Sequence, residues 1–158
     1  MNSEIEDRAA GAVVASAAGD ALGSQCEFGP PLGSSVPLEF GVGVFGHGAG
    51  EWTDDTSMAV PILKVLAEGE SLRSSSSLAS IFEEWADWAG DAKNIGAQTR
   101  TVLNSATRPI TEESARQAAE AVHVRSGRSG GNGSLMRTGP VALGYLALEA
   151  VAGGQERG

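Results

Sequence analysis

The spacing of apolar residues is the feature that most constrains how this chain can fold. Apolar side chains recur every three or four residues in several separate segments, and no segment alternates convincingly between apolar and polar residues. A spacing of three to four places side chains on one face of an α-helix, whereas a half-buried β-strand needs alternation. The 158 residues are therefore expected to form one all-α domain, since a chain of this length can bury a sizeable core.

Helix boundaries are predicted from the residues that interrupt this spacing. The first helix is expected over residues 4–18, because Gly19 and Asp20 should break it, with Asp20 capping a short turn that follows. The serines at 74–77 can cap a later helix, and Thr111 followed by two acidic residues is typical of a helix start. The later helices are expected over residues 78–89, 99–103, 111–124 and 135–150.

Two expected helices contain a proline. The helix through Met58 and Leu66 contains Pro61, which should kink it unless its regular part begins only near Ala59. The final apolar helix contains Pro140.

Glycines cluster in two segments, residues 29–50 and 127–139, within a total of 22. The first segment also holds several prolines and shows no sustained period, so it is predicted to be a long loop. Glycine lets a backbone come close to a ligand, and long loops in compact domains are usually functional or mobile. Both segments are therefore candidate functional loops.

Charge and cysteine content exclude several classes of protein. The formal net charge of −9 argues against a nucleic-acid partner and against docking on an anionic membrane. The single cysteine, Cys26, cannot form an intrachain disulfide and fits a reducing compartment. No basic region followed by an apolar run opens the chain, and no apolar stretch is long enough to span a membrane. A cytoplasmic protein is expected.

An acidic cluster stands at Trp52-Thr53-Asp54-Asp55-Thr56. Hard divalent cations prefer carboxylate, hydroxyl and carbonyl oxygens, so the cluster is a candidate metal site. Its other interpretation is an ordinary helix start, in which Thr or Asp caps the first turn and the second acid complements the helix dipole. On chemistry alone the helix start is favoured. Trp52 could shield a site from solvent or pack in the core.

A second candidate site is the glycine-rich segment 126–137. It leads directly into a helix, so backbone N–H groups of residues 132–135 could bind an anion, with Arg128 and Arg137 supplementing a phosphate site. The alternative is a glycine-rich turn with an Asn or Ser cap. The segment is neither a Walker loop nor a dinucleotide fingerprint.

Three further side chains could carry chemistry. Glu27 is a lone carboxylate in a loop after a helical segment, available to a cleft or simply solvated. His47 could be a ligand or a base, although a plain loop histidine is preferred. His123 is expected near a helix end, where it would complement the dipole.

Four ordered motifs extend over residues 11–140. They are Gly11 to Gly23 followed by Glu27-Phe28, Gly50-x-Trp52-Thr53-Asp54-Asp55-Thr56-Ser57-Met58, Asn94-Ile95-Gly96-x-x-Thr99, and Gly131-Asn132-Gly133-Ser134-Leu135-Met136-Arg137-x-x-Pro140. Together they resemble the ADP-ribosylglycohydrolases, the family of dinitrogenase reductase-activating glycohydrolase. The second motif looks like that family's first metal motif, and the fourth resembles its ribose and phosphate loop.

The resemblance implies a compact bundle of helices around a binuclear metal centre, usually Mg²⁺ and sometimes Mn²⁺. It implies that Thr53, Asp54 and Asp55 are metal ligands, that Asp54 and Asp55 share in catalysis, and that Glu27 assists water or substrate activation. The substrate-binding residues that it implies are Gly96, Gly131, Asn132, Gly133 and Ser134. The implied activity is removal of ADP-ribose from modified protein side chains, most closely an arginine-type N-glycosidic bond, or from a small ADP-ribosyl substrate.

One family motif is missing. The second metal motif, Asp-x-Asp-Thr/Ser, is absent, and no aspartate follows Asp91. The chain thus resembles the N-terminal half of the family domain, C-terminally incomplete, and two hypotheses remain. It is a hydrolase that lacks part of its active site and is inactive alone or completed by a C-terminal segment, or it is a non-catalytic module that binds ADP-ribose or a partner.

Overall fold

The computed structural model describes residues 3–155, with side chains described through residue 146. These residues form six α-helices and two short 3₁₀ helices, without a β-strand among them, which confirms the all-α prediction. The elements in chain order are α1 (Ser3–Gly23), η1 (Ser24–Cys26), α2 (Asp54–Ala67), α3 (Ser75–Trp88), α4 (Ala97–Ser105), α5 (Glu112–Ser126), η2 (Asn132–Arg137) and α6 (Thr138–Gln155).

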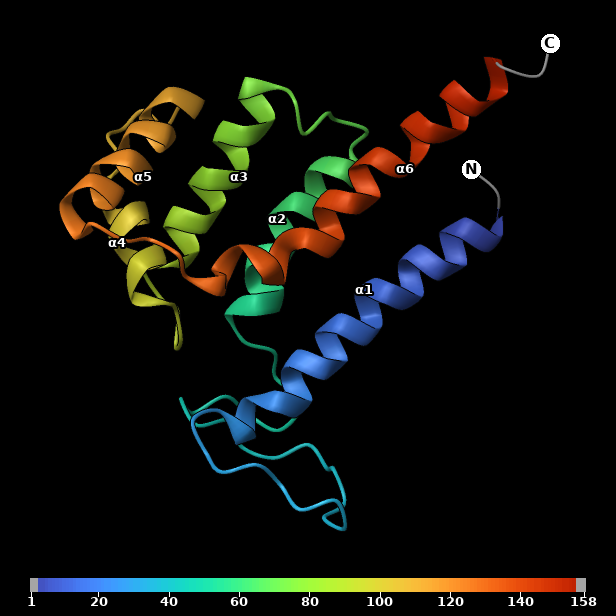
Figure 1. Ribbon diagram of the computed structural model, residues 1–158, viewed down its shortest axis with the longest axis vertical. Helices are drawn as coiled ribbons and strands as arrows, with labels where there is room; N and C mark the ends of the chain where they lie inside the picture. The colour runs from blue at the N-terminus through green and yellow to red at the C-terminus, as the bar shows by residue number, and fades with distance from the viewer. Residues whose placement is uncertain (1–2, 156–158) are drawn as a thin grey trace.

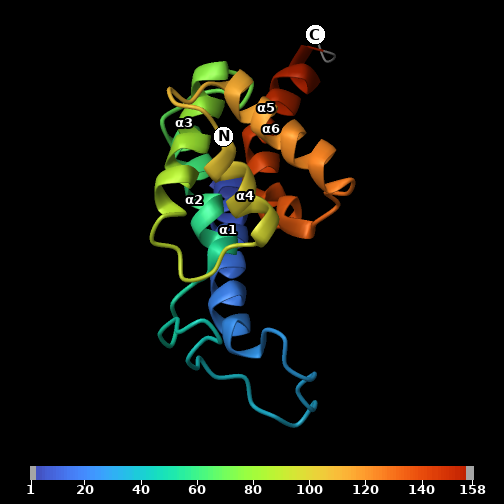
Figure 2. The ribbon, with the colours of Figure 1, turned by 90° about the vertical axis from the view of Figure 1, so that its left-hand side faces the viewer.

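The helices divide into a packed group and two flanking helices. Helices α2 to α5 pack against one another in sequence order, with α3 also contacting α5. Helices α1 and α6 lie beside α2 and contact each other, and the segment between α1 and α2 extends beyond one end of the helical body (Figures 1 and 2). None of the described helices is both long enough and apolar enough to cross a membrane.

The apolar core lies in the packed group and has two parts. One joins Phe82 of α3 to Leu103 of α4, and the other joins Ile62 of α2 to Ile81 of α3. The half-buried Trp85 contacts both parts. Burial of these side chains drives the association of α2 to α5, since removal of apolar surface from water is the main favourable contribution to folding.

Helix α1 differs from its prediction. It continues through Gly19 and Asp20 to Gly23, so the predicted break after residue 18 is wrong. A glycine in a helix costs only about 1 kcal/mol relative to alanine, which packing of the helix end can offset. Ala21 is the buried residue of this helix, so α1 is held to the body near its C-terminal end.

The structure fixes the bounds of the two proline-containing helices. Helix α2 begins at Asp54 and continues through Pro61, which excludes the alternative that its regular part begins only near Ala59. Pro61 itself is buried. Helix α6 begins at Thr138 rather than at Leu135, because residues 132–137 form a 3₁₀ helix, and it ends at Gln155 rather than near residue 150. Pro140 therefore lies in the first turn, where its missing N–H has no helical partner to lose.

Helices α3, α4 and α5 appear where predicted. Thr111 caps α5 by accepting a hydrogen bond from the Ser114 N–H, and the Ser114 side chain accepts one from the Thr111 N–H. This reciprocal pair is a capping box in which serine replaces the usual acid or amide. Helix α5 ends at Gly127, whose φ of 68° is left-handed and suits glycine.

Candidate active site

Asp20 of α1 organises the N-terminus of α2. Its carboxylate accepts hydrogen bonds from the backbone N–H groups of Thr53 and Thr56, both at 3.0 Å. It also accepts the hydroxyl hydrogens of the same two threonines, at 2.6 and 2.7 Å. The cap of α2 thus comes from a residue 33 positions earlier in the chain. A carboxylate at this position also complements the helix dipole.

This arrangement corrects two predictions. Asp20 does not break α1 or serve a following turn, and the side chain of Thr53 makes no cap hydrogen bond of its own. Sequence reasoning missed Asp20 as a site residue. Its signal was a single carboxylate among the alanines and glycines that end α1.

A cleft of about 750 Å³ brings the candidate residues together. Its acidic side carries the three carboxylates named from the sequence, and its other walls come from the start of α4 and from the glycine-rich segment. The lining residues predicted from the sequence are Glu27, Asp54, Asp55, Gly96, Gly131, Asn132, Gly133 and Ser134. Thr53 does not line the cleft but lies buried beneath it, with 2% of its surface exposed.

Asn94 links two of the carboxylates. Its side-chain amide donates to Glu27 Oε2 at 3.4 Å and to Asp54 Oδ1 at 3.3 Å. Both bonds are long, so they orient the two acids more than they stabilise them. The segment before α4 therefore contributes a side chain that connects the loop after α1 with the first turn of α2.

The three cleft carboxylates repel one another. The pKa of Glu27 is raised by partial burial and then by the charges of Asp54 and Asp55. Burial likewise raises the pKa of Asp54 and of Asp55, and the charge of Asp20 adds to both effects. None of the ion pairs among the described side chains includes Glu27, Asp54 or Asp55. The acidic side of the cleft therefore carries excess negative charge.

Helix α4 holds the glycine-rich segment in place. The side-chain amide of Gln98 donates to the Ser129 carbonyl at 3.1 Å. A Cβ atom at Gly131 would lie 3.3 Å from the Gln98 side-chain oxygen, closer than ordinary contact, so glycine permits this approach. A Cβ atom at Gly133 would lie 3.6 Å from Thr99 Oγ1, an ordinary contact distance. The segment faces the acidic side of the cleft because it rests on α4.

Comparison with known proteins identifies the family. The profile of the ADP-ribosylglycohydrolase family matches residues 1–156. The chain belongs to the ADP-ribosylglycohydrolase family. This confirms the resemblance drawn from the four motifs.

Two curated relatives carry a more specific name. The chain is 33% identical over 137 residues to the ADP-ribosylarginine hydrolase Tri1 of Pseudomonas putida (strain GB-1), covering 87% of this chain and 36% of the relative. It is 30% identical over 141 residues to the protein of the same name from Serratia proteamaculans (strain 568), covering 89% and 37%. The chain thus spans little more than a third of the length of these relatives. No solved structure matches it significantly.

The side chains at the acidic side of the cleft fit a metal ion in part. Two cleft carboxylates with excess negative charge and an adjacent hydroxyl are oxygen donors of the kind that Mg²⁺ accepts, often through one or two carboxylates and several waters. Within the described residues, however, no group of three or more His, Cys, Asp or Glu side chains is placed to hold a metal ion. The donor types are those that Mg²⁺ accepts, whereas the described residues do not supply a set of three such ligands.

The remaining candidates take other positions. His47 lies in the loop before α2, as preferred from the sequence, where it is buried and its Nδ1 has no hydrogen-bond partner among the described residues. Trp52 is 49% exposed and lies neither in the core nor along the cleft. His123 lies in the last turn of α5, as predicted, and its Nδ1 is 2.5 Å from Ser129 Oγ. Of the two arginines, Arg137 lines the cleft and Arg128 does not.

Proposed function

We propose that this chain forms the substrate cleft and first acidic motif of an ADP-ribosylglycohydrolase that removes ADP-ribose from arginine side chains of modified proteins. One observation carries the proposal: a single cleft joins the acids of the α2 N-terminus to the glycine-rich segment before α6. Family membership and two relatives named ADP-ribosylarginine hydrolase support the reaction class and the arginine linkage.

The reaction replaces the bond between C1′ of ADP-ribose and the guanidino nitrogen by a bond from C1′ to a water oxygen. One proton leaves the water and one reaches the departing nitrogen, and positive charge develops on the ribose in between. The negative charge of Glu27 would stabilise that ribose, while Asp54 and Asp55 would act through the metal ion described below. The raised pKa of Glu27 brings its proton exchange closer to neutral pH, which suits a carboxyl that accepts the water proton.

Thr53, Asp54 and Asp55 would hold Mg²⁺, with Mn²⁺ as an alternative. A bound divalent cation supplies Lewis-acid polarisation and lowers the pKa of a nearby water. The Thr53 hydroxyl already donates its hydrogen to Asp20, so its oxygen lone pairs are oriented independently of any ligand. Asp20 is therefore a positioning residue, because it holds Thr53 and the first turn of α2.

The opposite wall would bind the rest of ADP-ribose. Asn132, Gly133 and Ser134 offer an amide, a hydroxyl and backbone N–H groups to the distal ribose and the diphosphate, and Gly96 and Gly131 let the backbone approach. These groups are uncharged, so they bind phosphate oxygens without neutralising the acids across the cleft.

Binding of ADP-ribose to the 158-residue chain, measured by calorimetry with Mg²⁺ present, tests the cleft. We expect Ser134→Trp to abolish binding because the indole would fill the wall, and Ser80→Trp, at an exposed position of α3, to leave it unchanged. Unchanged binding by Ser134→Trp would refute the assignment.

A second function, binding of ADP-ribose without hydrolysis, is favoured by one observation. The described residues hold no complete set of acidic metal ligands. Release of ADP-ribose from modified arginine separates the two functions, since the binding module would retain affinity and show no turnover at any Mg²⁺ concentration.

A further inference from the structure

The loop after α1 turns sharply at the residue that follows Glu27. The Gly29 N–H donates to the Cys26 carbonyl at 3.3 Å, which closes a four-residue turn. Glu27, with a φ of −60° and a ψ of 135°, and Phe28, with a φ of 59°, occupy its two central positions. These angles match a type II turn, in which glycine or asparagine normally takes the second central position because φ there is positive.

Phe28 is therefore a bulky side chain at a position that suits glycine. A positive φ brings its Cβ atom close to its own backbone, so the turn is strained in a way that glycine would relieve. Packing does not explain the phenylalanine, since 89% of its surface is exposed. It lines the cleft instead. Backbone strain of this kind is concentrated at sites where the side chain has a function.

The ring of Phe28 keeps an open face. Phe45 contacts it edge to face, with the ring centres 5.9 Å apart and the ring planes at 90°. In this geometry Phe45 covers at most one face of the Phe28 ring. The segment that carries Phe45 is itself fixed, because the Val44 N–H donates to the Ser24 carbonyl at 3.1 Å. Among the described residues that line the cleft, Phe28 has the one aromatic side chain.

The charges of the cleft indicate which part of a substrate would meet this ring. Glu27 directly precedes Phe28, and Asn94 links Glu27 to Asp54 on the acidic side of the cleft. Arg137, at the end of η2, lines the wall that carries the glycine-rich segment. In an arginine-linked ADP-ribose the guanidinium is attached to C1′ of the ribose and the diphosphate to its C5′. The acidic side attracts the guanidinium and repels the diphosphate, so the guanidinium lies on the side of Phe28.

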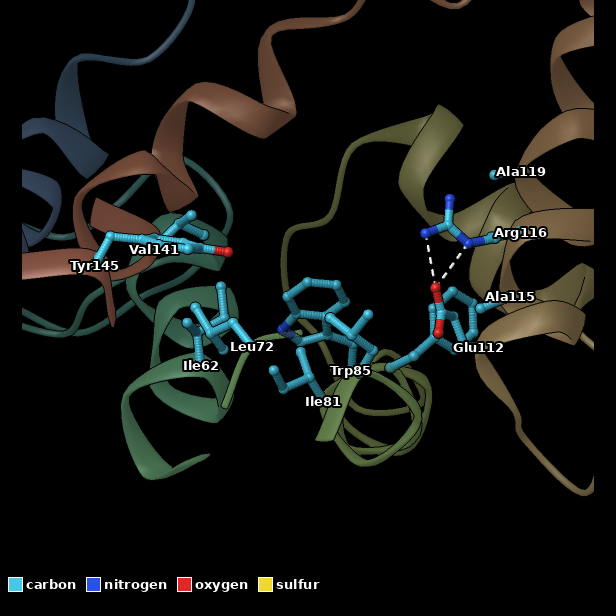
Figure 3. Close-up of a pocket in the computed structure, with 12 residues that line it drawn as sticks. Ile62, Leu72, Ile81, Trp85, Glu112, Ala115, Arg116, Ala119, Val141 and Tyr145 are labelled. Carbon is cyan, nitrogen blue, oxygen red and sulfur yellow. Dashed lines mark hydrogen bonds and ion pairs between the residues drawn. The ribbon is translucent and has the colours of Figure 1, made fainter. Parts of the chain in front are cut away.

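Other aromatic and acidic side chains already have partners. The ring of Trp85 has the Arg137 guanidinium 4.8 Å from its centre. In a separate cavity of about 410 Å³ between α3, α5 and α6, the Glu112 carboxylate faces the Arg116 guanidinium at 2.7 Å (Figure 3). The acidic side of the cleft differs from both places, because an exposed ring there adjoins a carboxylate that forms no ion pair among the described side chains.

We propose that Phe28 stacks on the guanidinium of the ADP-ribosylated arginine and so makes the cleft selective for an arginine linkage. A planar guanidinium packs well on an aromatic face and is attracted to it as a cation. The inference rests on the proposed function and deepens it by naming the residue that recognises the linked amino acid. Stacking of Phe28 on adenine, another planar group of the substrate, is an outcome that the test distinguishes.

Calorimetry with Mg²⁺ present tests the proposal on the 158-residue chain. The ligands are free ADP-ribose and two short peptides that carry ADP-ribose on arginine or on serine, with mass spectrometry confirming that each linkage stays intact. Phe28→Leu keeps an apolar side chain and removes the aromatic face. It should weaken binding of the arginine-linked peptide roughly fivefold and leave the other two ligands unaffected. The matched control Phe40→Leu, at a 53% exposed position outside the cleft, should change none of the three.

Phe28→Gly provides a readout that a merely structural role would not give. Glycine adopts a φ of 59° without strain, so the melting temperature should not fall, while the preference for the arginine-linked peptide should be lost. Phe28→Trp keeps an aromatic face and should keep the preference.

Four results would overturn the proposal. Weaker binding of free ADP-ribose by Phe28→Leu would assign the ring to adenine or ribose. Equal binding of the two peptides by the wild type, or an unchanged preference in Phe28→Leu and Phe28→Gly, would exclude the stacking while leaving the binding of ADP-ribose in the cleft intact. No binding of ADP-ribose by the wild type would refute the proposed function, and this inference with it.

Discussion

Carboxylates with two different environments meet at the N-terminus of α2. Asp20 accepts four hydrogen bonds from Thr53 and Thr56, and it joins the end of α1 to the start of α2. Asp54 and Asp55, in the first turn of the same helix, line the cleft, and burial and neighbouring charges raise the pKa of each. Asp20 has hydrogen-bond donors inside the protein, whereas Asp54 and Asp55 form no ion pair among the described side chains.

This difference indicates that, at one helix terminus, Asp20 contributes to stability whereas Asp54 and Asp55 contribute to function. A carboxylate that receives N–H and hydroxyl donors stabilises the fold in its charged form. Carboxylates crowded together without a cation destabilise the fold slightly and are retained where they bind something. Substitutions in the two groups should therefore have opposite effects on stability, and the predictions below test this.

The largest effect is expected at Asp20. Asp20→Ala leaves two partly buried N–H groups and two hydroxyls without their acceptor, so the free energy of unfolding should fall by about 3 kcal/mol. Urea denaturation followed by tryptophan fluorescence measures the change, with Asp7→Ala, an exposed acid of the same helix, as the control. A loss no greater than that of the control would mean that Asp20 does not anchor α2.

The next effect concerns metal addition and removal. Saturating Mg²⁺ should raise the melting temperature of the wild-type chain, by an amount equivalent to about 2.7 kcal/mol at one hundred times the dissociation constant, and EDTA should reverse it. The double variant Asp54→Asn/Asp55→Asn should not respond to Mg²⁺. Without metal it should be at least as stable as the wild type, because its repelling charges are gone. Equal Mg²⁺ responses in both proteins would exclude these acids as ligands.

A smaller effect is expected on the titration of Glu27 in the metal-free protein. Its carboxyl should titrate above the ordinary glutamate pKa, because burial and the charges of Asp54 and Asp55 disfavour its ionised form. Asp54→Asn removes one negative neighbour, so the pKa of Glu27 should fall toward its ordinary value. Carbon-detected NMR follows this carboxyl directly, and a pKa that stays constant or rises in the variant would show that the two acids do not interact.

The smallest effect is expected for an exposed ion pair next to the site. Lys93 Nζ lies 2.6 Å from Glu51 Oε1, and both side chains are more than 40% exposed. Lys93→Ala should leave the denaturation midpoint unchanged within error, since water screens such pairs. The pKa of Glu51, which the Lys93 hydrogen bond lowers, should rise toward its ordinary value. A clear fall in the denaturation midpoint would show that an acid in an exposed ion pair contributes to stability as Asp20 does.

Most of the helices could be predicted because the residues that start and end each of them are close together in the sequence. Thr111 and the residues after it contain a complete capping signal, and the structure places the start of α5 there. The glycines of segment 29–50 predicted a long loop, and no regular helix appears between Cys26 and Asp54. The predicted break of α1 after residue 18 was wrong, because the Asp20 hydrogen bonds and the burial of Ala21 hold the next turn of this helix.

The residues of the candidate site could be predicted from the sequence, but the contacts between them could not. The motifs named Glu27, Asp54, Asp55 and the segment around Asn132, and the cleft contains all of them. Neither the link through Asn94 nor the burial of His47 could be read from residue spacing, since both depend on segments that meet only after folding.

By itself, the sequence determined the helical class, the family and the chemical types of the site residues, because periodicity and motifs are properties of neighbouring positions. The tertiary structure decided which carboxylate holds the fold and which face the cleft. Asp20, Asp54 and Asp55 are chemically alike, and their roles differ because only Asp20 is brought against the free N–H groups of another helix. The packing of α1 on α2 creates that contact, and it leaves the other two acids lining the cleft.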